Sequence, residues 1–354
     1  MSQAHRGSDP QFVSRRGFVI ASGAVLAAIP ALGEEAVQAA PSARPRLADV
    51  VGTEHWTTKV AGADKVRLFL WRKRLRNPSG GGERQGTILF VHGSSISATP
   101  TFDLQIPGRP ECSIMDWFAR RGYDTWCVDC EGYGHSDKSR PINSDVSCGA
   151  DDLAAAAAYI LKQTGGEKLM VYGESSGGLR AGLFAQRHPE LVRRLVLDAF
   201  VWTGEGSPTL AERRKRLPQL RASNRRPIDR DFIRIIFTRD HPGTSDQTIV
   251  EAFADATLAL DTTVPTGTYV DMTSNLPLID PEKLTVPTLI LRGQYDGIAA
   301  FEDLSRFFAR LPSPDKQLIV MPGIAHSSTR SKNWAIVYHL LDSYFSQPAP
   351  IYTA

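Results

Sequence analysis

The sequence predicts an α/β fold with a mostly parallel, doubly wound sheet and an inserted helical cap. Short, continuous apolar runs recur along the chain, and each is typical of a strand that is buried on both faces. Helical patterns separate these runs, as happens where helices cover both faces of a parallel sheet. The alternation stops over residues 203–284, where only helical patterns are found. The chain has 354 residues, 42% hydrophobic and 22% charged, which fits a folded globular domain.

Residues 1–39 are predicted to be an export signal that takes no part in the fold. Arg15 and Arg16 directly precede an apolar run over residues 18–32, which is too short for a convincing membrane span. Small residues at the end of the segment predict cleavage after Ala39. The arginine pair resembles a bacterial twin-arginine signal, which implies a periplasmic or secreted protein. An ordinary secretory signal and an uncleaved anchor are the alternatives.

The core is predicted in two parts, residues 40–202 and residues 285–354. It opens with an antiparallel pair of strands over residues 52–74, where polar and apolar residues alternate. Buried strands are then expected at residues 87–93, 124–130, 167–173, 192–200, 286–293 and 316–321. Helices are expected at residues 113–123, 151–166, 175–190, 301–312 and 333–345.

The helical cap is predicted over residues 203–284, between the two parts of the core. Three helices are expected in it, over residues 207–220, 228–239 and 245–260. An insertion at this point would lie over the carboxyl ends of the strands. Open α/β sheets bind their ligands at that edge.

A G-x-S-x-G motif spans Gly173 to Gly177, between a predicted strand and a predicted helix. A loose turn is one interpretation. The other is a nucleophile elbow, a turn so tight that only small residues fit around a serine hydroxyl held at the sheet edge. The strand–turn–helix context favours the elbow, with Ser175 as the nucleophile.

A serine hydroxyl needs a base and an acid that orients the base. His326 follows the last predicted strand, which is where the base is expected. Asp296 follows the strand before it and is the predicted acid. Asp198, after an earlier strand, is the alternative acid.

Two backbone N–H groups are needed to bind the oxyanion that forms during acyl transfer. Ser176 directly follows the nucleophile and is predicted to supply one of them. Ser94, in the loop after the strand at residues 87–93, is predicted to supply the other. No metal site and no organic cofactor are implied by the sequence.

These landmarks together resemble the α/β-hydrolase superfamily. The matching segments are "FVHGSS", "VDCEGYGHSD", "VYGESSGG", "LRGQYDGIA" and "PGIAHS", in family order and spacing. The resemblance implies a serine hydrolase that cleaves a carboxylic ester through Ser175, His326 and Asp296 and an acyl-enzyme intermediate, and the predicted signal at residues 1–39 implies that it is exported. The same triad can cleave an amide, a lactone or a carbon–carbon bond. A non-catalytic binding protein on this fold is the alternative of another class.

The charge distribution bears on the partner. A net charge of +3 is too small to indicate a nucleic acid or a membrane surface, and no later segment predicts a stable membrane anchor. The expected partner is the small-molecule ester that the resemblance implies. Residues 211–240 nevertheless hold ten basic and four acidic residues. These residues form either a solvated face or a guide for an anionic substrate, for which Arg225 and Arg226 are the candidates. The sequence does not indicate an oligomeric state.

The four cysteines leave their pairing open. Export would permit disulfides among Cys112, Cys127, Cys130 and Cys148. Cys127 and Cys130 are spaced like a redox pair, but they fall on a predicted strand and not at a helix N-terminus. A buried structural role is therefore predicted for these two.

Overall fold

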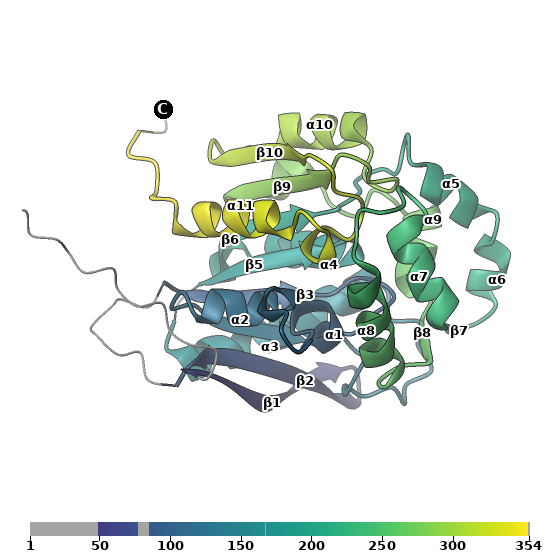
Figure 1. The fold of residues 1–354 in the computed structure, drawn as a ribbon, viewed down its shortest axis with the longest axis horizontal. Helices are drawn as coiled ribbons and strands as arrows, with labels where there is room; N and C mark the ends of the chain where they lie inside the picture. Colours follow the sequence, from purple (N-terminus) through teal and green to yellow (C-terminus); the bar gives the residue numbers. More distant parts are fainter. Residues whose placement is uncertain (1–48, 77–84, 167, 353–354) are drawn as a thin grey trace, which may run out of the picture. The chain divides into compact units, whose positions relative to one another are not determined.

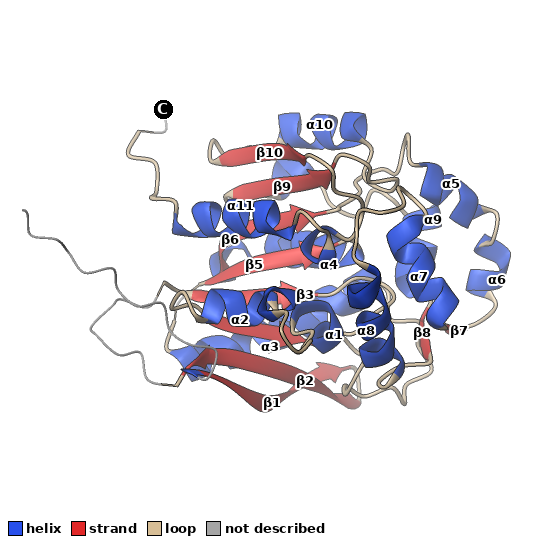
Figure 2. Cartoon of the chain, in the orientation of Figure 1, coloured by secondary structure: helices blue, strands red, loops and turns tan. Residues whose placement is uncertain are grey.

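The computed structural model describes residues 49–76, 85–166 and 168–352. The predicted export signal, residues 1–39, lies outside the described residues. An eight-stranded sheet in the order β1-β2-β4-β3-β5-β6-β9-β10 forms the centre of the fold (Figure 1). Helices lie on both of its faces (Figure 2), so the predicted α/β class is confirmed.

The strands of the sheet are β1 (Val50–Ala61), β2 (Asp64–Leu75), β3 (Thr87–Val91), β4 (Asp124–Val128), β5 (Leu169–Glu174), β6 (Val192–Asp198), β9 (Thr288–Gly293) and β10 (Lys316–Met321). The main helices around it are α1 (Ala98–Phe102), α2 (Ile114–Ala119), α3 (Val146–Thr164), α4 (Ser176–Arg187), α10 (Phe301–Arg310) and α11 (Trp334–Ser346). Short 3-10 turns η2 (Pro110–Cys112), η3 (Pro189–Leu191), η4 (Pro281–Lys283) and η5 (Ser328–Arg330) complete this part.

The strands differ in direction and in burial across the sheet. β1 pairs antiparallel with β2, and β2 pairs antiparallel with β4. The other strand pairs are parallel, from β4 through β3, β5, β6 and β9 to β10. β1 is largely exposed, whereas every residue of β3, β4 and β5 is buried. This difference explains why the first strands alternate in sequence and the inner ones are continuously apolar.

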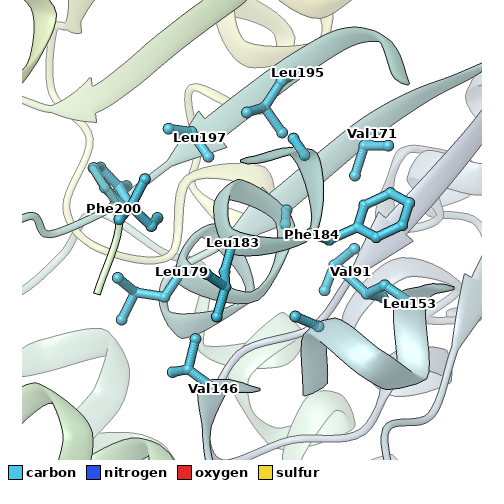
Figure 3. Close-up of a cluster of buried hydrophobic side chains, with 14 of the residues drawn as sticks. Val91, Val146, Leu153, Val171, Leu179, Leu183, Phe184, Leu195, Leu197 and Phe200 are labelled. Carbon is cyan, nitrogen blue, oxygen red and sulfur yellow. The ribbon is translucent and has the colours of Figure 1, made fainter. Parts of the chain in front are cut away.

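Two apolar clusters fill the space between the sheet and its helices. One joins Leu89, Val171 and Leu197 to side chains of α3, α4 and α10. Figure 3 shows part of this cluster, with Phe184 of α4 among the strand side chains. The other cluster joins Phe90 and neighbouring strand residues to α1, α2 and α11. Alternate residues of β3 thus pack on opposite faces of the sheet. The strand order places β3 among the inner strands.

The segment over residues 203–284, called the cap here, lies beyond the carboxyl ends of the parallel strands (Figure 1). It contains α5 (Pro208–Arg214), α6 (Leu217–Arg221), β7 (Arg225–Pro227), α7 (Arg230–Thr238), α8 (Gln247–Leu258), β8 (Thr263–Pro265) and α9 (Gly267–Ser274). The single helix predicted over residues 207–220 is wrong. The chain breaks it after Arg214, and Pro218 stands in the first turn of α6, where a proline is tolerated.

Three elements of the cap, β7, β8 and α9, were not predicted from the sequence. β7 and β8 form a two-stranded antiparallel ribbon. Each has only three residues, which is too short for a period-two pattern to show. α9 has a mixed set of polar and apolar residues and no strong helical periodicity, so its presence depends on packing against α5 and α6.

No disulfide joins any of the four cysteines, all of which lie in the described part of the chain. Cys127 and Cys130 are buried, as predicted for a structural role. Burial raises the pKa of the Cys130 thiol to about 12 and that of Cys127 well above its usual value. Both thiols are therefore protonated and unreactive at neutral pH. Among the described residues, no helix combines the length and the apolarity that crossing a membrane requires.

Candidate active site

The turn between β5 and α4 has the geometry of a nucleophile elbow. Ser175 has φ 59° and ψ −125°, which is a strained backbone conformation for a residue with a side chain. A Cβ atom on Gly173 would lie 2.4 Å from the carbonyl oxygen of Gly177. A Cβ atom on Gly177 would lie 2.2 Å from the carbonyl oxygen of Val91 at the end of β3. The glycines of the motif therefore allow α4 to approach the strands closely. Ser175 lies in the turn between them, at the carboxyl end of β5.

Ser175, His326 and Asp296 come together in one line of contacts. The His326 Nε2 atom is 3.0 Å from the Ser175 Oγ atom. The Nδ1 atom of the same ring is 3.1 Å from both carboxylate oxygens of Asp296. A base within hydrogen-bonding reach of a hydroxyl, and an acid that fixes the tautomer of the base, can activate that hydroxyl as a nucleophile.

The environment of Asp296 keeps its carboxylate charged. Burial by itself would raise the pKa of Asp296, but the positive charge that forms on His326 and its hydrogen bond outweigh burial and lower the pKa to about 2. The backbone N–H groups of Ile298 and Ala299 also donate to Asp296 Oδ1, at 2.8 and 3.2 Å. A buried, ionised carboxylate at this position stabilises the imidazolium that proton abstraction creates.

Asp198, the alternative acid, is placed elsewhere. It is fully buried behind the elbow, where the hydroxyls of Tyr172 and Ser328 donate to its Oδ2 atom. Burial raises the pKa of Asp198 to about 7 in spite of these hydrogen bonds. Its contacts therefore tie β5 and β6 to the loop after His326, and the contact with the imidazole is made by Asp296.

Ser94 and Ser176 lie side by side next to the nucleophile. The Ser94 hydroxyl donates a hydrogen bond of 2.6 Å to Ser176 Oγ. Ser176 opens α4, so its backbone N–H belongs to the first turn of the helix and has no acceptor within the helix. The same helix end carries a partial positive charge. This arrangement would stabilise a negative charge that forms next to Ser175 Oγ.

Two buried side chains that sequence reasoning missed hold the loop after β3. The Arg180 guanidinium of α4 donates to the carbonyl oxygens of His92 and Gly93, at 3.0 and 3.4 Å. His92 accepts from the N–H of Cys130 at 3.1 Å, and its Nδ1 atom is 2.8 Å from Gly93 O. Burial lowers the pKa of His92 to about 3, so its ring is neutral. An arginine inside a helix pattern gives no sequence signal for this role.

A cavity lies in front of Ser175 and is closed on one side by the cap. Its lining from the core comprises Gly93, Ser94, Ser95, Ile96, Thr101, Glu174, Ser175, His326, Ser327 and Arg330. The cap contributes Arg213, Ile236, Arg239, Phe253 and Tyr269. The cavity therefore combines the reactive side chains with a polar, arginine-rich wall.

The two arginines predicted to guide a substrate are placed differently from each other. Arg225 lies in the ribbon of the cap and donates to the carbonyl oxygens of Gly132 and Thr263, at 3.0 and 2.6 Å. It holds the ribbon to the core and does not line the cavity, and its role as a guide for an anionic substrate stays a prediction. Arg226 reaches the cavity edge, where its Nη2 atom donates to Ser95 Oγ at 2.6 Å.

Arg330 lies in the core wall of the cavity and has a carboxylate partner. Its guanidinium forms an ion pair with Glu174, the residue that precedes Ser175. The hydroxyl of Thr329 also donates to Glu174, at 3.3 Å. Both Arg330 and Glu174 are buried, so the pair contributes little net charge to the cavity.

Two groups of side chains in the described part of the chain have the spacing of metal ligands. Glu131, Cys148 and Asp152 form one group, but the Lys59 ammonium already lies 3.0 Å from Glu131 and 2.6 Å from Asp152. The other consists of Asp240, Asp296 and His326. In that group His326 and Asp296 bind each other, and Asp240 is paired with Arg239 at 3.2 Å. Both groups have partners from the protein itself.

Comparison with known proteins gives a family and a fold. Residues 108–333 match the sequence profile of the hydrolase family described as serine aminopeptidase S33. A 2-hydroxy-6-oxononadienedioate/2-hydroxy-6-oxononatrienedioate hydrolase of Paraburkholderia phymatum is 32% identical over 155 residues, which are 43% of this chain and 48% of that protein. A second hydrolase of that name, from Burkholderia vietnamiensis, is 32% identical over 133 residues, 38% of this chain and 41% of that protein. The match thus spans about half the length of these curated relatives.

Solved structures with the same fold share little sequence with this chain. A thermophilic esterase from Thermogutta terrifontis superposes with a TM-score of 0.57 at 21% identity, over 82% of this chain and 97% of that one. A monoacylglycerol lipase from Paleococcus ferrophilus gives a TM-score of 0.58 at 18% identity, over 79% of this chain and 98% of that one. These similarities establish the fold, which is also the fold that the sequence motifs implied.

The close approach at the elbow predicts a large effect of one methyl group. Gly177→Ala would drive a Cβ atom into the backbone carbonyls of Val91 and His92, which cannot rotate away as a side chain could. We expect a loss of stability on the order of 1–3 kcal/mol, measured by thermal or urea unfolding. Gly166→Ala is the control, because the nearest atoms to its new Cβ lie at 3.4 Å and beyond. Equal stability of the two variants would contradict the packing described here.

Proposed function

This chain belongs to the serine aminopeptidase S33 family of α/β hydrolases, and on that premise we propose that it is a serine hydrolase that cleaves a carboxylic ester of a small molecule. The observation that carries the proposal is the line of contacts from Ser175 Oγ through His326 to Asp296. The fold shared with esterases and lipases adds to it. A binding protein on this fold would have no need of a strained serine beside a histidine and a buried carboxylate.

The proposed reaction begins with attack on the substrate carbonyl. Ser175 Oγ bonds to the carbonyl carbon while His326 Nε2 takes the hydroxyl proton. The ionised Asp296 stabilises the imidazolium through Nδ1. Negative charge moves to the carbonyl oxygen, and the backbone N–H groups of Ser94 and Ser176 are proposed to bind it.

The tetrahedral intermediate then collapses. His326 returns its proton to the leaving alkoxide, the C–O bond breaks, and the alcohol departs from an acyl-enzyme on Ser175. Water adds to the acyl carbon with His326 as its base, and collapse of the second intermediate releases the carboxylic acid and the free serine. The steps need no atom other than those of the protein, the ester and one water molecule.

Cleavage of a carbon–carbon bond is the second candidate reaction. It is favoured by the similarity to the two 2-hydroxy-6-oxononadienedioate hydrolases, although the aligned part covers less than half of either of them. The same nucleophile, base and oxyanion donors would serve that reaction. Turnover of a vinylogous diketo acid that greatly exceeds turnover of esters of similar size would favour this candidate over the first.

We propose in addition that the protein is exported and acts in the periplasm or outside the cell. The support is the sequence of residues 1–39, with Arg15 and Arg16 ahead of a short apolar run. An exported hydrolase would meet its small-molecule ester outside the cytoplasm.

Loss of the nucleophile should remove activity and leave the fold intact. Ser175→Ala is expected to reduce kcat by about 10⁴- to 10⁶-fold, because the remaining groups cannot form the acyl-enzyme. Hydrolysis of p-nitrophenyl esters and covalent labelling by a fluorophosphonate reagent both measure this. Near-normal turnover, or labelling of the folded Ser175→Ala protein, would refute the proposed function.

The two candidate acids should respond differently to the same substitution. Asp296→Asn is expected to reduce kcat by about 10³- to 10⁴-fold, since an amide would favour the wrong tautomer of His326. Asp198→Asn keeps the shape of a residue that has no contact with the imidazole in the described structure, and its kcat should fall by less than about ten-fold. The comparison uses proteins checked for folding by circular dichroism, and the reverse order of effects would make Asp198 the acid.

The export proposal has a test of its own. Arg15→Lys combined with Arg16→Lys keeps the positive charge but removes the arginine pair that the export machinery recognises. Unprocessed precursor should then collect in the cytoplasm, as followed by cell fractionation and immunoblotting. Normal processing of the double variant would show that the twin-arginine route is not used.

A further inference from the structure

The cap side of the cavity holds three arginines around one tyrosine. The Arg226 guanidinium lies 4.1 Å from the ring centroid of Tyr269, and the Arg213 guanidinium lies 4.3 Å from it. Arg239 lies on the same wall of the cavity, and its charge also acts on Tyr269. We call Arg213, Arg226, Arg239 and Tyr269 the arginine–tyrosine cluster.

The cluster has more positive charge than the protein neutralises. Its carboxylate contact is the one between Arg239 Nε and Asp240 Oδ1, at 3.2 Å. No ion pair to Arg213 or Arg226 is found within the residues the structure describes. Two buried guanidinium nitrogens, Arg226 Nε and Arg239 Nη2, also lack a hydrogen-bond partner among the described residues. Buried donors without acceptors are costly, so the cluster is suited to an acceptor from outside the chain.

Other arginines of the cap provide the contrast. Arg230 forms ion pairs with Glu251 and Asp255 on the neighbouring helix. Arg234 forms ion pairs with Glu251 and Asp231. Arg230 and Arg234 are therefore neutralised by acidic residues of the cap, whereas Arg213 and Arg226 have no ion pair among the described residues.

The electrostatic state of the cluster agrees with an excess of positive charge. Burial, together with the charges of Arg239 and Arg226, lowers the pKa of Arg213 to about 10. Burial alone would raise the pKa of Tyr269, but Arg213 and Arg226 outweigh it and lower the pKa to about 7. A hydrogen bond from Ser95 and the charge of Arg239 act in the same direction. The lowered pKa of Tyr269 reflects the positive charge around its phenol, which favours the ionised form.

We propose that the arginine–tyrosine cluster binds a free carboxylate of the substrate, so that the preferred substrate is a small ester that also carries a carboxylate group. This inference rests on the proposed function, because it assigns a substrate class to the same cavity. Arg213, Arg239 and Tyr269 line that cavity together with Ser175 and His326. Guanidinium groups bind carboxylates with two parallel hydrogen bonds, which gives orientation as well as affinity.

The cluster adjoins the loop that is expected to bind the oxyanion. Ser95 Oγ lies 3.3 Å from the Tyr269 hydroxyl and accepts from Arg226 at 2.6 Å. Ser95 directly follows Ser94, one of the two proposed oxyanion donors. A substrate carboxylate held by the cluster would therefore lie a short distance from the carbonyl under attack, which limits the substrate to a short chain between its two functional groups.

The protonation of Tyr269 gives the inferred preference a pH dependence. Below about pH 7 the neutral phenol can donate to a carboxylate, and Arg213, Arg226 and Arg239 remain charged. As the pH rises through about 7, the phenolate adds a negative charge and competes with the substrate for the same arginines. Preference for the charged ester should consequently fall over that range, and Tyr269→Phe should abolish this fall.

The test compares two esters that differ in charge and match in chain length. Monomethyl glutarate carries a free carboxylate and methyl pentanoate does not, and a pH-stat measures hydrolysis of both by the full-length protein at pH 6.5. We expect kcat/KM to favour the charged ester. The ratio of the two kcat/KM values should fall about ten- to a hundred-fold in Arg213→Gln and in Arg239→Gln. Arg216→Gln, which alters an exposed arginine of the same segment, should keep the ratio of the native protein.

A second measurement needs no turnover and is made on the native protein. At pH 7.5, glutarate bound to the cluster should raise the pKa of Tyr269 and reduce the tyrosinate absorbance of the native protein. Tyr269→Phe identifies the source of the signal, and glutaramide is the neutral control. A loss of absorbance with glutarate and not with glutaramide supports the proposal. An equal response to inorganic phosphate would overturn the assignment to a carboxylate.

The outcomes separate this inference from the proposed function. If a fluorophosphonate labels Ser175 and methyl pentanoate is hydrolysed, but the charged ester has no advantage and glutarate leaves the absorbance unchanged, the hydrolase stands and the carboxylate site is refuted. If glutarate changes the absorbance but Ser175 is not labelled and neither ester is hydrolysed, the carboxylate site stands and the serine hydrolase is refuted.

Discussion

The close approach of α4 to the ends of β3 and β5 is the constraint on which the rest of the site depends. Gly173 and Gly177 permit that approach, since a side chain on either would overlap backbone atoms. The strain at Ser175 is maintained by packing on both sides of the turn. The same helix sends Arg180 back to the carbonyls of His92 and Gly93. One helix therefore places the serine and also fixes the loop that faces it.

A second set of buried contacts fixes the loop that carries the histidine. Three residues soon after His326 bind the ends of β5 and β6: Ser328 donates to Asp198, and Thr329 and Arg330 donate to Glu174. Glu174 and Asp198 occupy the last positions of their strands. The loops of the serine and the histidine are thereby attached to the same strand ends, which supports the 3.0 Å contact between the two side chains. The position of Asp198 at the end of a strand made it a candidate acid. Its contacts with Tyr172 and Ser328 give that position a structural role.

The sequence predicts those site residues whose position is determined by the strand that precedes them. Ser175 directly follows β5, and Asp296 and His326 lie in the loops that follow β9 and β10. Parallel strands bring their carboxyl ends to one edge, so three local signals suffice. Arg180 and Tyr269 could not be found in this way. Arg180 lies in a helix that reads as an ordinary amphipathic segment, and its target carbonyls are 88 and 87 residues away. The sequence likewise does not indicate β7 and β8, because these short strands pair with residues that are far away along the cap.

The cap shows why a local excess of charge in a sequence does not by itself indicate a binding site. Arg234 and Arg239 are five positions apart, yet Arg234 is neutralised by Glu251 and Asp231, while the buried Nη2 atom of Arg239 has no hydrogen-bond partner among the described residues. Arg234 lies on α7 and meets Glu251 of α8, whereas Arg239 directly follows α7 and lines the cavity. This difference depends on tertiary packing. The carboxylate of Asp240 also lies within 4.8 Å of the ligand atoms of Asp296 and His326. Asp240 therefore contacts Arg239 of the cavity wall and also lies close to the histidine–aspartate pair, so one carboxylate belongs to the surroundings of both.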